Sequence, residues 1–254
     1  MSRSILLSTA CWLSGWKARR IPCASLLLSA AAAIVFLLPS LAVQLQYDRA
    51  ALAAGQVWRL VSGHWTHYAF DHFFWDVTAF ALLGLACERR SRSRFLVCVT
   101  ASAVVISLSV WLWLPGMSAY RGLSGVDSAL FALLVAELWS EAVRSGKPTQ
   151  AAIPVVCLAA FLLKISFELA TGNNLFVQSR GSGPVGVPFA HIAGAVVGLL
   201  VGFGMADQAR RSGRPTAILR DAQVAPKITA TDLDEFADLS AQPRWPPSRA
   251  ACVS

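Results

Sequence analysis

The chain has 254 residues, of which 56% are hydrophobic and only 14% are charged, and its mean hydropathy is +0.55. A soluble domain carries about 25% charged residues, so this composition excludes disordered, collagen-like and most soluble classes and indicates an integral membrane protein. The net charge of +8 is not gathered on one basic face but follows the loops between apolar segments. We therefore expect a lipid bilayer as the partner and no nucleic acid.

Six apolar stretches are long enough to cross a bilayer, whose core takes roughly 20 helical residues. They predict an all-α, polytopic membrane protein, a bundle of six transmembrane helices. A membrane domain over 21–206 would follow a cytoplasmic N-terminal segment, 1–20, and precede a mobile cytoplasmic tail, 207–254. The predicted spans are 22–43, 66–87, 95–114, 124–143, 149–170 and 188–206.

The positive charges predict the direction of these spans. Most Lys and Arg residues lie before the first span, in the second and fourth connections, and in the tail, whereas the other connections hold only Arg49, Arg59, Arg121 and Arg180. Because positively charged loops stay in the cytoplasm, we expect both termini to be cytoplasmic.

Polar residues gather near the outer ends of the second, fourth and sixth spans, which run in the same direction. His72 and Asp76 lie near the start of the second span, Ser124 begins the fourth, and His191 lies about three residues into the sixth. A helix rises 1.5 Å per residue, so these side chains share one depth. Polar groups are costly inside a membrane, and this shared level is therefore the candidate functional site.

Small residues predict how two of these spans pack. His191, Gly194 and Gly198 share one helical face, and glycines four apart permit close helix packing in membranes. A matching stripe on the fourth span would bring His191 against Ser124; its residues are Ser124, Ser128 and Ala132.

The motif Gly122-Leu-Ser124-Gly125 has the features that a serine nucleophile requires. Glycines admit a substrate backbone, and the free N–H groups of a helix N-terminus can stabilise an oxyanion. His191 would act as the general base. The alternative is a capping box, in which Ser124 caps its own helix and Asp127 reinforces the cap.

As a set, these motifs resemble the rhomboid intramembrane serine proteases. The resemblance covers roughly residues 20–206 and rests on the Ser124 and His191 motifs together with three further segments: Val57-Trp58-Arg59, His67 through His72 to Asp76, and Gly84 to Glu88. It implies a catalytic dyad of Ser124 and His191 that needs no cofactor or metal. It further implies an oxyanion site supported by His72, Asp76 and Gly122, and membrane-protein substrates cut near the outer face of a bacterial cytoplasmic membrane.

Asp76 departs from the commonest rhomboid pattern, which has asparagine at this position. An ionised carboxylate would repel a developing oxyanion. Two states of Asp76 remain open: a carboxyl group kept protonated by burial, or a carboxylate turned to hold His72.

Lys164 and Glu168 are four residues apart near the outer end of the fifth span. An i, i+4 ion pair lowers the cost of both charges in a membrane, and we expect this pair to be structural. Together with the lead Tyr120-Arg-Gly122-Leu-Ser124, the pair resembles the rhombosortase branch. That likeness implies single-pass substrates with a C-terminal Gly-Gly sorting tail; the sequence does not predict an oligomeric state.

Two alternatives of other classes remain open. The four histidines suggest a metal or haem protein, although no H-E-x-x-H motif is present and none of the six cysteines joins them in a ligand pattern. We expect His64 and His67 to be interfacial loop residues in an aromatic belt with Trp58 and Trp65. The other alternative is an inactive rhomboid-like protein that binds membrane helices.

Overall fold

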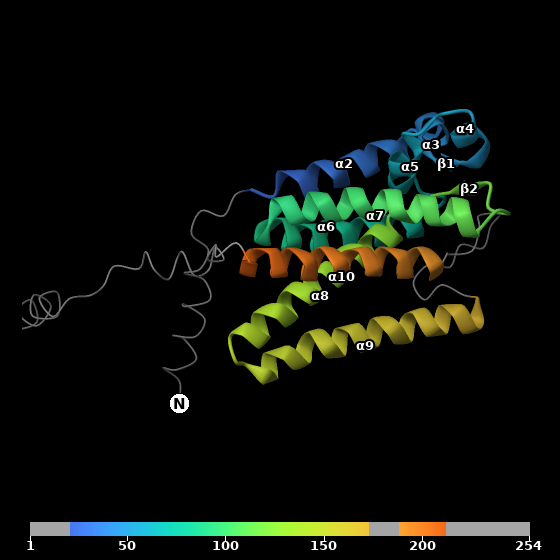
Figure 1. Ribbon diagram of the computed structural model, residues 1–254. Coiled ribbons are helices and arrows are strands. Elements are labelled where there is room, and N and C mark those ends of the chain that lie inside the picture. Colours follow the sequence, from blue (N-terminus) through green and yellow to red (C-terminus); the bar gives the residue numbers. More distant parts are fainter. Residues whose placement is uncertain (1–20, 173–187, 212–254) are drawn as a thin grey trace, which may run out of the picture. The chain divides into compact units, whose positions relative to one another are not determined.

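The computed structural model describes residues 21–172 and 188–211, and these form a helical bundle with very little strand (Figure 1). The predictions for the N-terminal segment and for most of the tail fall outside the described residues. Five of the six predicted spans each correspond to one helix, and the first corresponds to two helices. The long helices are α2 (Cys23–Leu37), α6 (Phe70–Arg90), α7 (Arg92–Trp113), α8 (Ser124–Arg144), α9 (Pro148–Thr171) and α10 (Pro188–Arg211).

The first predicted span is shorter than expected. A second helix, α3 (Pro39–Leu45), follows α2 at an angle of 114°, so residues 22–43 do not form one straight rod. Proline at position 39 explains the break, because its ring cannot follow a helical residue without a clash and it donates no hydrogen bond.

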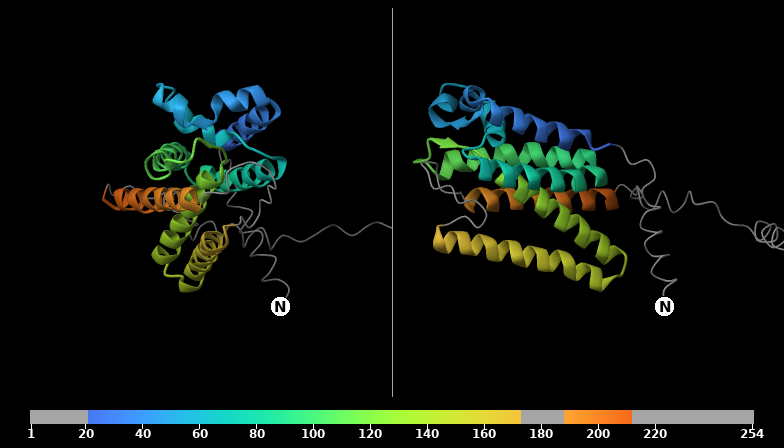
Figure 2. Two further views of the ribbon diagram at one scale, coloured as in Figure 1. Left: turned by 90° about the vertical axis from the view of Figure 1, so that its right-hand side faces the viewer. Right: turned by 180° about the vertical axis from the view of Figure 1, so that it is seen from behind.

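Among the described residues, α6, α7 and α9 are long and apolar enough to cross a membrane, and the bent pair α2–α3 is a fourth candidate. Helix α8 is less apolar because it carries Asp127, Glu137, Glu141 and Arg144. These charges lie in the best-enclosed helix: α8 packs against α6, α7 and α9, and its glycine and alanine positions meet α10. Figure 2 shows α8 slanting through the bundle among these neighbours.

Charged side chains stabilise the end of the bundle where α6 meets α7. Glu137 of α8 accepts hydrogen bonds from Arg90 at 2.8 Å and Arg94 at 2.9 Å. Glu88 of α6 accepts from the backbone N–H groups of Ala24 and Ser25, at 3.1 and 2.7 Å. It thereby satisfies two free donors at the start of α2.

Short elements cap the opposite end of the bundle, which we call the site end. These are β1 (Tyr47–Asp48), α4 (Arg49–Ala53), α5 (Arg59–Ser62), the 3-10 turn η1 (Gly63–Trp65) and β2 (Ala119–Tyr120). Strand β1 pairs antiparallel with β2, with Tyr47 opposite Tyr120 and Asp48 opposite Ala119. This pairing fixes the chain just before α8 begins at Ser124.

Candidate active site

Ser124 is the first residue of α8, and the start of this helix is capped by another helix. The backbone N–H groups of Leu123 and Ser124 donate to Oδ2 of Asp76 at 2.8 and 3.1 Å. Leu123 occupies the capping position and forms no side-chain cap. The capping-box alternative is therefore wrong, because Ser124 lies one position too far along the helix and Asp76 of α6 supplies the acceptor.

Asp76 lies beside two histidines, His67 just before α6 and His72 in the first turn of α6. Its Oδ2 lies 3.1 Å from Nε2 of His72 and 3.4 Å from Nε2 of His67. The same oxygen thus faces two backbone donors and two imidazoles, as an acceptor-only carboxylate does. Of the two states left open by the sequence, this arrangement matches a carboxylate turned to hold His72.

Gly122 admits this cluster beside the nucleophile candidate. Its φ is +123°, a backbone conformation that favours glycine. A Cβ at this position would lie 2.6 Å from Nε2 of His72 and 3.1 Å from Oδ2 of Asp76. Any side chain here would be strained and would displace the imidazole.

Helices α8 and α10 touch through their backbones next to Ser124 and His191. A Cβ on Gly125 would lie 3.1 Å from the carbonyl oxygen of Ala190, and one on Gly194 would overlap the carbonyl oxygen of Gly125. Ser124 precedes Gly125 and His191 follows Ala190, so both residues lie one position from this contact. The structure thus brings the two segments together at one level.

The α8 stripe that receives α10 shares Ala132 with the predicted stripe, but its other two members lie one position further along the helix. A Cβ on Gly198 would overlap the carbonyl oxygen of Ala129 and would lie 3.0 Å from Cβ of Ala132. The contact stripe therefore runs through Gly125, Ala129 and Ala132, and the prediction of Ser124 and Ser128 is wrong. Glycine at 125 offers the closer approach, which leaves Ser124 beside the contact rather than inside it.

His191 contacts Glu168, a partner that was not predicted for it. His191 is buried, with 5% of the residue exposed. Its Nδ1 lies 3.1 Å from Oε2 of Glu168 on α9. The other carboxylate oxygen of Glu168 accepts from Nζ of Lys164 at 2.8 Å. The ion pair expected from the i, i+4 spacing is present, but it also reaches the next helix. The depth of Glu168, level with His191, was the signal that could have revealed this contact.

His64 and His67 are buried, which makes their prediction as interfacial loop residues wrong. His64 is fully buried; its Nε2 lies 2.9 Å from the carbonyl oxygen of Ala103 and 3.1 Å from Oγ of Ser107. Burial lowers the pKa of His64 to about 4, so the ring is neutral near pH 7. His64 therefore fastens the 3-10 turn η1 to α7. Of the two tryptophans assigned to the same belt, Trp58 is 54% exposed, as an interfacial residue would be, whereas Trp65 is buried and donates from Nε1 to the carbonyl oxygen of Leu28.

No group of three His, Cys, Asp or Glu side chains within residues 21–172 and 188–211 is placed to hold a metal ion. His67 and His72 share Asp76, whereas His64 binds carbonyl and hydroxyl oxygens and His191 binds Glu168. His64 and His191 thus each have a hydrogen-bonding role, whereas neither ring nitrogen of His67 has a hydrogen-bond partner among the described residues.

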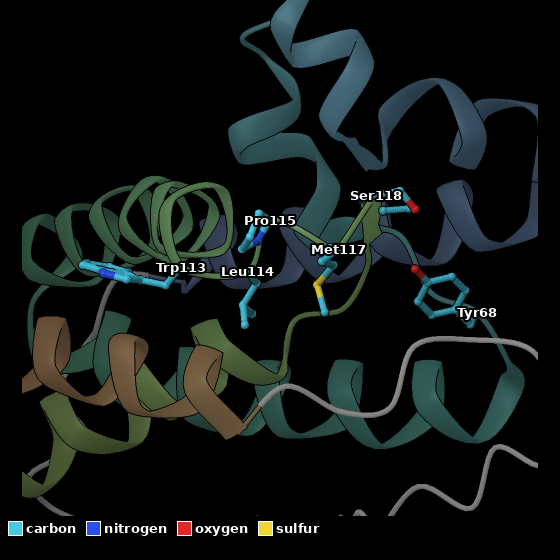
Figure 3. Close-up of a pocket in the computed structure, with 8 residues that line it drawn as sticks. Tyr68, Trp113, Leu114, Pro115, Met117 and Ser118 are labelled. Carbon is cyan, nitrogen blue, oxygen red and sulfur yellow. The ribbon is translucent and has the colours of Figure 1, made fainter.

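A pocket of about 600 Å³ opens at the site end, between Tyr68 and the segment that joins α7 to β2 (Figure 3). Its lining is mainly apolar. The buried hydroxyl of Tyr68 has no hydrogen-bond partner among the described residues, while the guanidinium of Arg121 lies 4.9 Å from the centre of its ring. The residues that line the pocket are Tyr68, Trp113, Leu114, Pro115, Gly116, Met117, Ser118 and Ala119.

In a comparison with known protein families, the family model described as Rhomboid domain matches residues 54–208. The match includes all the site residues described above and begins after α2 and α3, so it is shorter than the resemblance over 20–206. No curated protein matches the chain.

Proposed function

Because this chain belongs to the rhomboid family of intramembrane serine proteases, we propose that it is a serine endopeptidase with Ser124 as nucleophile and His191 as general base. The observation that carries the proposal is the backbone contact of α8 with α10, where Gly125 meets Ala190. The hydroxyl and the imidazole lie on the two residues that flank this contact. A nucleophile and its base must come within hydrogen-bond reach, about 3 Å, in the reacting complex.

The chemistry follows from the free atoms of these side chains. Nδ1 of His191 faces Glu168, which leaves Nε2 to accept the proton of Ser124. As the proton moves, Oγ attacks the scissile carbonyl; the imidazolium then protonates the leaving amine, and an acyl-enzyme remains. Water, activated by the same imidazole, hydrolyses the ester. No cofactor takes part in these steps.

The negative charge of the tetrahedral intermediate needs donors next to Ser124. In the proposed mechanism, the start of α8 and the ring of His72 supply them, and Gly122 leaves room for the substrate. The resting structure commits the N–H of Ser124 to Asp76. The developing oxyanion therefore competes with this carboxylate, so Asp76 supports the site by holding His72 and restrains it by occupying a donor.

The proposed substrates are single-pass membrane proteins. The family acts on membrane proteins within the bilayer, and the pocket lined by Tyr68 and the segment after α7 would hold apolar substrate residues near the cut. By the likeness to rhombosortases, a C-terminal Gly-Gly sorting tail is the substrate we favour. By the same likeness, the proposed location is a bacterial cytoplasmic membrane. The excess of positive charge in the predicted inner loops favours cytoplasmic termini and a site near the outer face.

The test is cleavage of a tagged single-span protein with a Gly-Gly tail by wild type, Ser124→Ala and His191→Ala. The matched control is Ser128→Ala, which removes a hydroxyl one turn further along α8. We expect cleavage to be lost in the first two variants and retained in the control. If Ser124→Ala cuts as well as wild type, the nucleophile is assigned wrongly.

Labelling with a fluorophosphonate probe separates a protease from an inactive membrane-helix binder, the alternative function. An active site serine reacts covalently with the probe, whereas a binder does not. We expect wild type to be labelled and Ser124→Ala to remain unlabelled in the same membranes.

A further inference from the structure

We propose that Glu168 is the third member of the catalytic set and positions His191 as the acid of a triad does. The inference rests on the proposed function and goes beyond the Ser–His dyad that the family implies. Its basis is the contact between Nδ1 of His191 and Oε2 of Glu168, at 3.1 Å, between two helices that are separate in the sequence.

The contact determines which ring nitrogen is basic. A carboxylate only accepts hydrogen bonds, so Nδ1 of His191 carries the proton and donates it to Glu168. Nε2 then keeps its lone pair and is the atom that receives a proton from Ser124. The bond also fixes the rotation of the imidazole, because Glu168 is 3% exposed and has little freedom to follow another ring position.

Lys164 makes a buried carboxylate tolerable at this depth. Its ammonium binds Oε1 of Glu168 at 2.8 Å, while Oε2 is directed to His191. An ion pair that served only to neutralise charge would not require the second oxygen to point at another helix. Because one oxygen of Glu168 binds Lys164 and the other faces His191, a negative charge lies beside the ring that becomes positive during catalysis.

The proton balance of the step is simple. When Ser124 attacks, its proton moves from Oγ to Nε2 of His191, and the imidazolium carries one positive charge. Nδ1–H stays on its nitrogen and Glu168 stays ionised, so the carboxylate stabilises the cation without taking a proton. The proton on Nε2 then leaves with the amine product.

A purely structural role would give different results. If the bond only joined α9 to α10, Glu168→Gln would retain a polar contact, and activity would follow stability. If Glu168 positions the base, the neutral amide removes the charge and no longer selects the tautomer. In chymotrypsin-type proteases, the corresponding Asp to Asn change lowers kcat by about 10⁴.

The experiment compares Glu168→Gln and Glu168→Asp with wild type in the Ser124-dependent cleavage assay. The control is Glu141→Gln, the same chemical change at the partly exposed partner of Arg90. We expect Glu168→Gln to lower kcat about 100-fold or more with little change in KM. Glu168→Asp should restore part of the rate, and Glu141→Gln should match wild type.

Two readouts make failure interpretable. A downfield proton resonance from Nδ1–H of His191 is expected in wild type and in Ser124→Ala, and should be absent from Glu168→Gln. If Glu168→Gln cleaves and labels within about threefold of wild type, the role of Glu168 is refuted while the proposed function stands. If wild type neither cleaves nor labels at Ser124, the proposed function fails and the catalytic role of Glu168 fails with it.

Discussion

Replacing Asp76 is the sharpest test of how the start of α8 is held. Oδ2 accepts from the N–H groups of Leu123 and Ser124 and lies within 3.4 Å of two imidazoles, and the residue is 6% exposed. Asp76→Ala leaves one buried and one partly buried backbone donor without this acceptor, at about 1–3 kcal/mol each. We therefore expect the free energy of unfolding to fall by about 2–6 kcal/mol.

Asp76→Asn keeps an oxygen where Oδ2 lies and removes only the charge. The backbone bonds become neutral and weaker, and we expect a loss of about 1 kcal/mol. Thermal unfolding in detergent micelles, followed by tryptophan fluorescence, should separate the two variants, since 1 kcal/mol corresponds to about 2–4 °C in a chain of this size. Equal melting temperatures for Asp76→Ala and Asp76→Asn would refute the cap.

The same pair tests the competition with the oxyanion. Asp76→Asn should retain or exceed wild-type cleavage, because the N–H of Ser124 no longer faces an anion. A large loss of activity in a folded Asp76→Asn protein would show that the carboxylate itself is needed.

Three further predictions concern the scaffold. The free energy of unfolding should fall as the pH drops below 6.5, because burial lowers the pKa of His64 to about 4 and the unfolded chain therefore binds the proton first. The expected loss is about 1.4 kcal/mol per pH unit. If His64→Gln shows the same slope of Tm against pH as wild type, this prediction is wrong. Gly194→Ala should separate α10 from α8, because its Cβ would overlap the carbonyl oxygen of Gly125. Labelling of Ser124 by the fluorophosphonate probe should then fall sharply. Gly204→Ala is the control and should behave as wild type, because nothing lies within 4 Å of the added Cβ. Glu88→Ala should lower the free energy of unfolding by about 2–6 kcal/mol, since it leaves two buried N–H groups at the start of α2 without their acceptor, at about 1–3 kcal/mol each. A melting temperature equal to that of wild type would exclude this cap.

The helices themselves were predictable because hydrophobic length is a local property of the sequence. Five of the six apolar stretches each form one helix, and the first forms the bent pair α2–α3. The motif around Ser124 correctly predicted where α8 begins. The bend at Pro39 does not show in hydropathy, because proline breaks a helix through its backbone geometry and leaves the apolar length unchanged. The shared level of Ser124 and His191 followed from counting residues along parallel helices, which needs only the helical rise.

Which side chains meet across helices was decided by the tertiary structure. The sequence identified Lys164 and Glu168 as a pair because i, i+4 contacts lie on one helix, but the reach of Glu168 to His191 depends on where α9 stands beside α10. The same is true of Asp76, whose spacing from His72 was visible but whose capping of α8 was not, and of His64, whose polar character suggested an interface while its buried partners lie on α7. Contacts within a helix are fixed by its period, whereas contacts between helices depend on the rotation and tilt at which the whole bundle packs.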